Sequence, residues 1–336
     1  PSARFTVFGD KLWWAPTPIS VERPPQPEQF SIEISKQHIR RATDCVHAIY
    51  AFCRRVDDIA DGDALPLVQM TERLYQQTQE RDIHLREIHK TPPSGDSKTH
   101  FERLSALVDT RCKINQMMNK IFYEKHDPVM VAMNAVVRDF SPKLKDIDAI
   151  IEGMEDDLFE VRCKTWDDLR AYCYKVASAV GLVLIEVYGY KDQSARLHAI
   201  DMGIQLQMIN VLRDVVEDYD DNRVYVPIDV LNHHGISIEE LPTNVLVGDS
   251  RWTAFVNEYV SQIRRHMSSG RRLLPLLNSR ARVQPRLMCE AYEAILAEIM
   301  RRSGDVFSSR PTISVYAKVK LGFKTWLRKQ FLFLTR

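Results

Sequence analysis

Helical periodicity runs almost without interruption from Phe30 to Phe333, and it limits more than any other feature what this chain can fold into. Apolar residues recur at spacings of three and four over long stretches, whereas the alternation of β-branched residues that marks strands is rare. Only 12 of the 336 residues are glycine, about half the usual share, which argues against glycine-rich nucleotide loops and turn-rich β-sandwiches. No repeat of fixed period and no change in composition divides this body. The pattern predicts a single all-α domain.

Prolines dominate the start of the chain. Residues 16–27 contain five of them, so residues 1–29 are predicted to form an extended arm or a loop laid over the domain. The helical domain then comprises residues 30–336. The chain begins at Pro1 without a methionine, and its first residues lack the charged and apolar regions of a secretory signal.

Charge and cysteine content exclude several classes of function. Lys and Arg number 46 against 45 Asp and Glu, a net charge of +1, so we expect no nucleic-acid partner. Hydrophobic residues make up 45% and charged residues 27%, as in ordinary globular proteins. The six cysteines form no C-x-x-C pair and predict reduced thiols in the cytoplasm, or in a plastid if a leader was removed. No uninterrupted apolar run is long enough to span a membrane.

Two acidic segments far apart in the chain carry the strongest functional information. The first is YAFCRRVDDIADG, from Tyr50, and the second is QMINVLRDVVEDY, from Gln207. Helical spacing places Asp57 and Asp61 one turn apart, on the same stripe as Tyr50 and Arg54. An equivalent stripe in the second segment consists of Gln207, Asn210, Asp214 and Asp218. The remaining positions are largely apolar, so we expect both stripes on helices with little other exposure.

Carboxylates that face one cavity need a partner of opposite charge. Two of them about 6 Å apart repel by roughly 3 kcal/mol at an effective dielectric constant near 20. Hard oxygen ligands without histidine or cysteine suit Mg²⁺, which completes its octahedron with water and phosphate oxygens. Two facing helices of this kind predict a clamp for a magnesium–diphosphate. The alternative is that each segment is a solvated acidic helix face. The clamp is favoured because arginines and side-chain amides share the stripes of the aspartates, on helices that are otherwise apolar.

At these residues the chain resembles the squalene/phytoene synthases, which join two prenyl diphosphates head to head. The resemblance covers most of the chain. Besides the first acidic segment, it rests on YCYKVASAVGL from Tyr172, on QMINVLRDVVEDYDDNRVYVP from Gln207, and on the later block AYEAIL. The segments IIEGMEDDL and DVF-x-x-R, which ends at Arg310, are similar to the bacterial members, notably phytoene and presqualene diphosphate synthases.

The resemblance implies an isoprenoid-synthase helical bundle with a central active-site cavity. The aspartates that would ligate two or three Mg²⁺ ions, with Mn²⁺ as the alternative, are Asp57, Asp61, Asp214 and Asp218. Two auxiliary acids would assist them, Asp58 and Glu217. The amides that would complete the second metal site are Gln207 and Asn210.

The resemblance also implies residues that bind the substrates. Arg54 and Arg213 would hold phosphate oxygens. Tyr172 matches a tyrosine near the reacting carbons. Further matches to phosphate or pocket positions are Tyr50, Arg223, Tyr292 and Arg310, and those to pocket-lining positions are Val176, Val180 and Gly181. One block departs from the family: where members carry S-x-S-F or S-x-T-F, this chain has EQFSIEIS, which leaves the flap-side phosphate contacts unassigned.

The implied chemistry requires a dry, apolar cavity below the charged residues. An allylic diphosphate ionises to a carbocation when the leaving group is neutralised, and magnesium ions and arginines supply that electrostatic trap. The stretch Tyr172–Glu186 is rich in small and aliphatic residues, which suits a helix beside long prenyl chains. Plain core packing is the other interpretation of each of these residues. We assign no separate base, since the departing diphosphate can take the proton.

The C-terminal segment Tyr316–Arg336 combines an apolar stripe with a basic one that contains Lys320, Lys324 and Arg328. Such a helix predicts either peripheral contact with an anionic membrane surface or docking on the body of the protein.

We therefore predict a magnesium-dependent prenyltransferase that condenses two farnesyl or geranylgeranyl diphosphates through a cyclopropylcarbinyl diphosphate. The product would be phytoene, presqualene diphosphate or a squalene-type hydrocarbon, in carotenoid or triterpenoid biosynthesis. The lack of a Rossmann fingerprint favours a non-reductive reaction. One alternative is a head-to-tail elongase or a terpene cyclase, but the Tyr172 block and RVYVP disfavour it. Another is a non-catalytic scaffold, but such a protein would have no reason to keep four mutually repelling aspartates in register. Nothing in the sequence predicts an oligomeric state.

Overall fold

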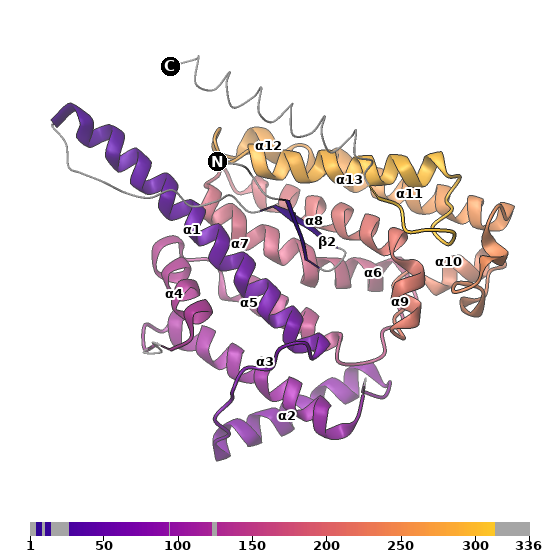
Figure 1. Cartoon of the computed structure of the whole chain (residues 1–336), viewed down its shortest axis with the longest axis horizontal. Coiled ribbons are helices and arrows are strands. Elements are labelled where there is room, and N and C mark those ends of the chain that lie inside the picture. The colour runs from indigo at the N-terminus through magenta and orange to yellow at the C-terminus, as the bar shows by residue number, and fades with distance from the viewer. Residues whose placement is uncertain (1–4, 9–10, 15–26, 94, 123–125, 313–336) are drawn as a thin grey trace.

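The computed structural model describes residues 5–8, 11–14, 27–93, 95–122 and 126–312, with side chains from residue 41 onward. Within these ranges the chain is a bundle of helices with one short hairpin of strands (Figure 1). The predicted all-α fold is therefore confirmed. The basic segment Tyr316–Arg336 lies outside the described residues.

The elements follow one another in this order. The first half of the chain contains β1 (Phe5–Phe8), β2 (Lys11–Trp14), α1 (Pro27–Asp61), α2 (Glu72–His89), α3 (Ser97–Met118), α4 (Pro128–Phe140), α5 (Leu144–Asp156) and α6 (Trp166–Cys173). The second half contains the π-helix η1 (Tyr174–Ser178), α7 (Ala179–Tyr188), α8 (Ser194–Arg213), α9 (Val215–Asp220), α10 (Ile228–His233), the 3₁₀ turns η2 (Ile238–Glu240) and η3 (Asn244–Leu246), α11 (Ser250–Gly270), α12 (Leu273–Leu276) and α13 (Val283–Arg301).

The N-terminal segment contains structure that its sequence did not predict. β1 and β2 pair antiparallel, with Phe5 opposite Trp14, inside residues 1–29, for which we expected an extended arm. Helix α1 begins at Pro27, slightly before the predicted boundary at residue 30.

Several helices begin after a residue whose side chain accepts hydrogen bonds from free backbone amides. Asp96 accepts from the amides of Lys98 and Thr99, both at 3.0 Å, at the start of α3. Asp127 does the same for α4, whose first residue is Pro128. These caps explain why the chain breaks into separate helices although its apolar pattern is nearly continuous.

Helix α8 is the centre of the bundle. It packs against α7, α11, α13 and η1, and almost every residue from Met202 to Arg213 is buried. One core cluster surrounds α8, α11 and α13, and a second lies among α1, α3, α4 and α5, on the opposite side of the bundle in Figure 1. The clusters meet along η1 and α7, where Tyr174, Val176 and Tyr188 contact both.

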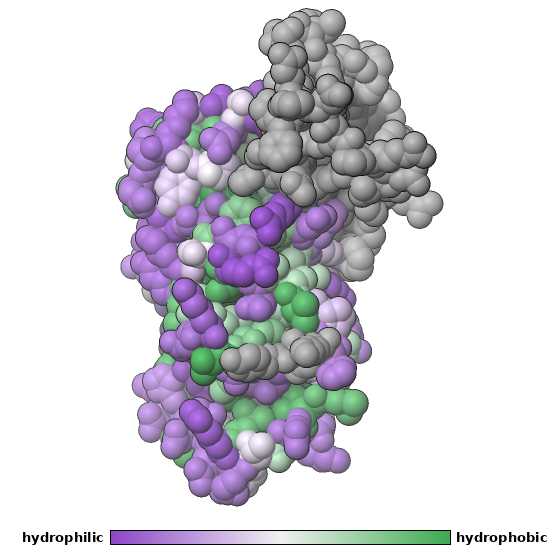
Figure 2. All heavy atoms as spheres, turned by 90° about the vertical axis from the view of Figure 1, so that its left-hand side faces the viewer, coloured by the Kyte–Doolittle hydropathy of each residue, from purple (hydrophilic) through white to green (hydrophobic). Residues whose placement is uncertain are grey.

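The surface of the α1–α4 side mixes hydrophilic and apolar side chains, as Figure 2 shows. The exposed large apolar residues on α2, on α4 and after α3 include Ile83, Ile88, Ile121 and Val131. Exposed apolar residues of this kind are normal on a globular protein and by themselves mark no functional site.

All six cysteines are free, as their spacing predicts. One stretch, Trp166–Tyr188, is long and apolar enough to cross a membrane by length and composition alone. Half of its most apolar window is buried within the protein, where it packs against α5 and α8. A helix in the core of a globular protein can have the same length and composition.

Candidate functional site

A cavity lies along the seam between the two core clusters. Residues of α1, α5, η1, α7, α8 and α13 form its wall, and it holds about 1380 Å³ of empty space counted out to its open mouth. Most of the wall is apolar. Apart from Tyr188, its polar lining residues are Tyr50, Arg54, Asp57, Asp157, Tyr172, Gln207, Asn210 and Tyr292. Together with the acidic segments beside them, they form what we call the charged end.

The first acidic segment forms the last turns of α1. Tyr50, Arg54 and Asp57 line the cavity, and Asp58 and Asp61 continue to the end of the helix. The Nη1 atom of Arg54 lies 3.2 Å from Asp57 Oδ2, and its Nη2 atom lies 2.5 Å from Asp58 Oδ1. Burial raises the pKa of Asp58, and the charge of Arg54 offsets only part of this effect. Helix α1 therefore presents carboxylates and a cation together.

The second acidic segment consists of two helices that meet at Asp214. α8 ends at Arg213 and α9 begins at Val215, so Asp214 occupies the junction, with φ −104° and ψ 17°. The backbone amide of Asp214 still donates to the Asn210 carbonyl at 2.9 Å, and that of Asp218 donates to the Asp214 carbonyl at 2.8 Å. The predicted stripe consequently keeps its helical spacing across the junction.

Two arginines hold the carboxylate of Asp214. Arg213 donates to it from Nε at 2.6 Å and from Nη2 at 2.5 Å, and Arg310 donates from Nε at 2.9 Å. The side chain of Arg213 is only 3% exposed and that of Asp214 only 11%. Arg310 also lies 3.8 Å from Glu217, whose pKa burial raises. Arg310 therefore lies beside the second acidic segment although it comes from the far end of the described chain.

Arg223 connects the two acidic segments. Its Nη2 atom donates to Asp61 Oδ1 at 3.3 Å, and its backbone amide donates to the Asp218 carbonyl at 2.7 Å. Asp218 and Arg223 also line a small second hollow beside Tyr225. The fold thus brings both acidic segments to the same end of the cavity, with arginines between their carboxylates.

The donor atoms at this end suit a hard cation. In the part of the chain that the structure describes, no three His, Cys, Asp or Glu side chains converge as a ligand cluster, and the carboxylates pair with arginines. Asn210 Oδ1, however, is buried without a hydrogen-bond partner among these residues, whereas its Nδ2 donates to Gln207 Oε1 at 3.2 Å and to the Tyr292 hydroxyl at 3.3 Å. A buried acceptor without a donor is costly, and a cation would satisfy it. Asn210 and the adjacent carboxylates therefore fit Mg²⁺ or Mn²⁺.

Two stacked tyrosines lie beside the charged end. The ring centroids of Tyr172 and Tyr225 are 4.1 Å apart at an interplanar angle of 22°, and the Tyr225 hydroxyl donates to Asp157 Oδ1 at 2.9 Å. Burial, together with the charge of Asp157, raises the pKa of both tyrosines well above the usual value. Both hydroxyls therefore stay protonated near neutral pH.

Sequence reasoning identified Tyr172 but did not identify Asp157 or Tyr225 as site residues. Both lie in segments that carried the family resemblance, IIEGMEDDL and RVYVP. Three adjacent acids at the end of an apolar helix were the available indication for Asp157.

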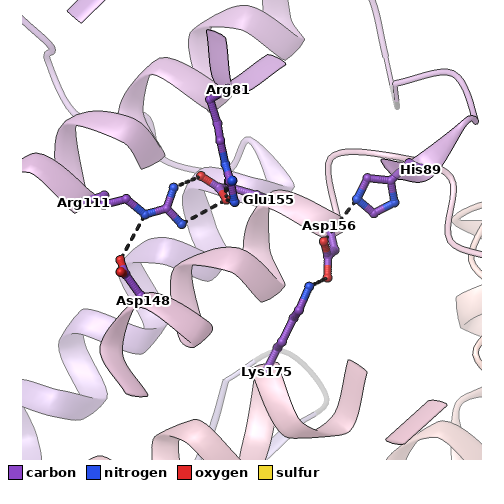
Figure 3. A network of polar contacts seen from close by, with 7 residues as sticks. All are labelled: Arg81, His89, Arg111, Asp148, Glu155, Asp156 and Lys175. Atoms are coloured by element: carbon purple, nitrogen blue, oxygen red, sulfur yellow. Dashed lines mark hydrogen bonds and ion pairs between the residues drawn. The ribbon is translucent and has the colours of Figure 1, made fainter. Parts of the chain in front are cut away.

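These three acids, at the end of α5, have different partners. The first two pair with four basic side chains of neighbouring elements: Glu155 with Arg81 and Arg111, and Asp156 with His89 and Lys175 (Figure 3). The third, Asp157, lines the cavity. Because the basic residues come from α2, α3 and η1, the ion pairs fix the position of α5 and of the carboxylate that follows it.

Close packing of α8 against η1 forms the apolar wall. A Cβ atom on Gly203 would lie 2.5 Å from Cα of Ser178, so any larger residue at that position would force α8 and η1 apart. The hydroxyl of Ser178 donates to the Ile200 carbonyl at 2.7 Å. The predicted lining residues Val176, Val180 and Gly181 do line the cavity on this helical run.

The sequence model of the squalene/phytoene synthase family matches residues 34–317. The chain belongs to this family. Its members are prenyltransferases of the head-to-head prenyl diphosphate synthase type, so the resemblance found in the sequence is confirmed.

Relatives with assigned activities cover most of the chain. The phytoene synthase of Mycobacterium tuberculosis is 26% identical over 283 residues, 84% of this chain and 81% of the relative. The 15-cis-phytoene synthase of Synechocystis is 27% identical over 300 residues, 85% of this chain and 77% of the relative. The presqualene diphosphate synthase of Sinorhizobium fredii is 26% identical over 260 residues, covering 77% and 79%.

Solved structures share the fold. A dehydrosqualene synthase in complex with ligand superimposes with a TM-score of 0.66 at 22% identity, covering 87% of this chain and 88% of that one. The squalene synthase HpnC from Alicyclobacillus acidocaldarius gives 0.60 at 22% identity, covering 77% and 83%. These similarities establish the isoprenoid-synthase bundle.

Proposed function

We propose that this prenyltransferase condenses two geranylgeranyl or farnesyl diphosphates head to head, with Mg²⁺, to phytoene or presqualene diphosphate. One observation carries the proposal: both acidic segments and four arginines lie at one end of an apolar cavity. The M. tuberculosis and Synechocystis relatives, both phytoene synthases, favour geranylgeranyl diphosphate. The S. fredii relative supports presqualene diphosphate as the second candidate product.

The charged end would bind the two diphosphate groups. Arginine presents a planar fork of donors that matches phosphate oxygens, and the arginines available here are Arg54, Arg213, Arg223 and Arg310. Mg²⁺ or Mn²⁺ would be held by Asp57, Asp61, Asp214 and Asp218, assisted by Asp58, Glu217, Gln207 and Asn210. When bound, the ions supply positive charge that neutralises the leaving diphosphate.

The reaction would proceed through two ionisations. In the first, the C–O bond of one substrate breaks, the double bond of the second attacks the allylic cation, and loss of a proton closes the ring of a cyclopropylcarbinyl diphosphate. In the second, the remaining diphosphate leaves, the cation rearranges, and loss of another proton gives the hydrocarbon. The departing diphosphate would accept each proton.

The cavity would protect these cations from water. Its apolar wall excludes a competing nucleophile. The stacked rings of Tyr172 and Tyr225 lie at the charged end, and an aromatic face attracts a cation within about 6 Å of its centroid. Tyr172 would therefore stabilise the allylic cation by its ring, with its hydroxyl protonated.

Two further features of the proposal concern the product. Reduction to squalene itself would require hydride from a nicotinamide cofactor, for which the chain has no Rossmann fingerprint. Peripheral membrane contact through Tyr316–Arg336 stays a prediction, because that segment lies outside the described residues.

The test is incubation of the full chain with farnesyl or geranylgeranyl diphosphate, with Mg²⁺ or with EDTA, followed by solvent extraction and mass spectrometry. We expect a head-to-head product with Mg²⁺ and none with EDTA. Linear diphosphates of greater length would instead indicate a head-to-tail elongase. No turnover of either substrate, with no diphosphate binding, would indicate a non-catalytic relative.

A further inference from the structure

Beyond the charged end, the lining of the cavity extends to Tyr188, at the C-terminus of α7. Tyr172 and Tyr188 both line the cavity on one continuous helical run. At 1.5 Å per residue they are separated by about 24 Å along that run. Three apolar residues line the cavity around Tyr188, and with it they form what we call the floor: Leu277, Pro285 and Met288.

Hydrogen bonds fix Tyr188 at its ring and at its backbone. Its hydroxyl donates to Gln284 Oε1 at 2.9 Å, and its carbonyl accepts from Asn278 Nδ2 at 3.0 Å. The backbone amide of Asn278 also donates to the Gly189 carbonyl at 3.1 Å. Gly189 has φ +69°, and a Cβ there would lie 2.4 Å from Asn278 Nδ2, so the turn after Tyr188 requires glycine. The floor is therefore attached to the segment between α12 and α13.

Ion pairs hold the surrounding helices together at this end. Arg196 of α8 donates to Asp146 of α5 at 2.5 Å and to Glu186 of α7 at 2.6 Å. The Asp146 side chain is fully buried and that of Arg196 is 11% exposed. Helices α5, α7 and α8 consequently cannot separate near the floor without breaking buried charge pairs, which is costly.

We infer that the ring of Tyr188 limits the length of the prenyl chain that the cavity accepts. The inference rests on the proposed function. It assigns the selection of substrates by the length of their prenyl chain to one side chain. Packed protein interiors yield little to added volume, and the contacts above keep this ring from moving aside. A chain whose last isoprene unit reaches the floor would collide with the ring, whereas shorter chains would end before it.

The test compares kcat/KM for farnesyl, geranylgeranyl and geranylfarnesyl diphosphates in the wild-type chain and in Tyr188→Ala. Removing the ring opens the floor. We therefore expect the ratio of kcat/KM for the next longer substrate to kcat/KM for the best wild-type substrate to rise about tenfold or more. Tyr188→Phe keeps the ring and should retain the wild-type preference. Val187→Ala is the matched control, because Val187 is buried on the same helix but does not line the cavity.

The outcomes separate this inference from the proposed function. A folded, active Tyr188→Ala with the wild-type preference would overturn the inference and leave the proposed function intact. A wild-type chain that turns over none of the three substrates would overturn the proposed function itself. If Tyr188→Ala does not fold, Tyr188→Leu, which shortens the side chain but keeps an apolar group, provides the same comparison.

Discussion

The Nη2 atom of Arg223 lies 3.3 Å from Asp61 Oδ1, and this contact joins residues 162 positions apart in the chain. It connects the end of α1 to the segment after α9, so each acidic segment is placed partly by the other. The Asp61 side chain is 41% exposed and that of Arg223 is 21% exposed. We therefore expect this pair to matter more for substrate binding than for stability.

Replacing Arg223 by alanine tests this expectation. The substitution removes a cation from the charged end, and loss of one preorganised donor typically lowers the rate by about 10²–10³-fold. We expect a fall of that order in kcat/KM, measured by steady-state kinetics, with a change in the free energy of unfolding of only about 1 kcal/mol. Arg271→Ala, which removes an exposed pair with Glu293, is the control. Unchanged kinetics would remove Arg223 from the site.

Asp214→Asn and Asp61→Asn should differ in stability although both lower activity. Asp214→Asn leaves the guanidinium of Arg213, only 3% exposed, with a weaker partner, and breaking a buried pair costs about 3–5 kcal/mol. Asp61 is far more exposed, so its substitution should cost about 1 kcal/mol or less. Urea denaturation of both variants measures the difference. Equal stability losses would contradict the burial of the Arg213–Asp214 pair.

Gly203→Ala and Gly181→Ala form a matched pair for the apolar wall. A Cβ at Gly203 meets the backbone of Ser178 at 2.5 Å, whereas a Cβ at Gly181 comes no closer than 3.7 Å to the Ala199 carbonyl oxygen. We expect Gly203→Ala to destabilise the protein by about 1–3 kcal/mol, as overpacking does. Gly181→Ala should be neutral or stabilising by up to about 1 kcal/mol, because alanine favours helix. Thermal unfolding of both variants would show whether η1 and α8 pack this closely.

Glu155→Gln tests the ion pairs that hold α5. Glu155 is fully buried between Arg81 and Arg111, so the substitution leaves two arginines with a weaker partner and should cost about 3–5 kcal/mol in unfolding free energy. Asp167→Asn, at an exposed carboxylate paired with Arg170, should cost almost nothing. A variant as stable as the wild type would mean that the ion pairs of Glu155 do not hold α5 in place.

The buried tyrosines predict a loss of stability in alkali. Burial raises the pKa of Tyr172, Tyr225 and Tyr259 well above the value near 10 expected in the unfolded chain. The folded state therefore holds these protons more tightly, and stability that is complete below about pH 10 is lost as the pH rises towards the folded-state pKa values. Urea unfolding at increasing pH should show this fall, with a shallower slope in Tyr172→Phe. Identical slopes would contradict the assignment.

Local sequence was sufficient for the helices and for most residues of the charged end. Asp57 and Arg54 could be placed on one stripe because both lie within two turns of one helix. The break at Asp214 could not be predicted, because Arg213 and Asp214 satisfy the helical pattern, and their partner Arg310 comes from a distant part of the chain. Contacts such as this depend on the tertiary fold, which helical periodicity does not encode.

The boundary between α3 and α4 has a clear indication in the sequence, whereas the π-helix has none. α3 ends at Met118 and α4 begins at Pro128, and Asp127–Pro128 is a typical start of a helix. The π-helix η1 has no such indication, since its residues YKVAS are compatible with an ordinary α-helix. Asp157 is placed by the packing of α5 against η1, and Tyr225 joins it through a hydrogen bond between residues 68 positions apart in the chain.

The π-helix η1 affects how the sequence of this protein can change in evolution. A π-turn holds one residue more than an α-turn, so the residues before and after η1 are rotated relative to an unbroken helix by about 100°. Deleting a single residue such as Ala177 would restore the regular helix and turn the phenol of Tyr172 away, while Val180 and Gly181 kept their places. The position of the Tyr172 ring at the charged end and the apolar lining of the cavity can thus diverge separately in evolution, through a gain or loss of one codon.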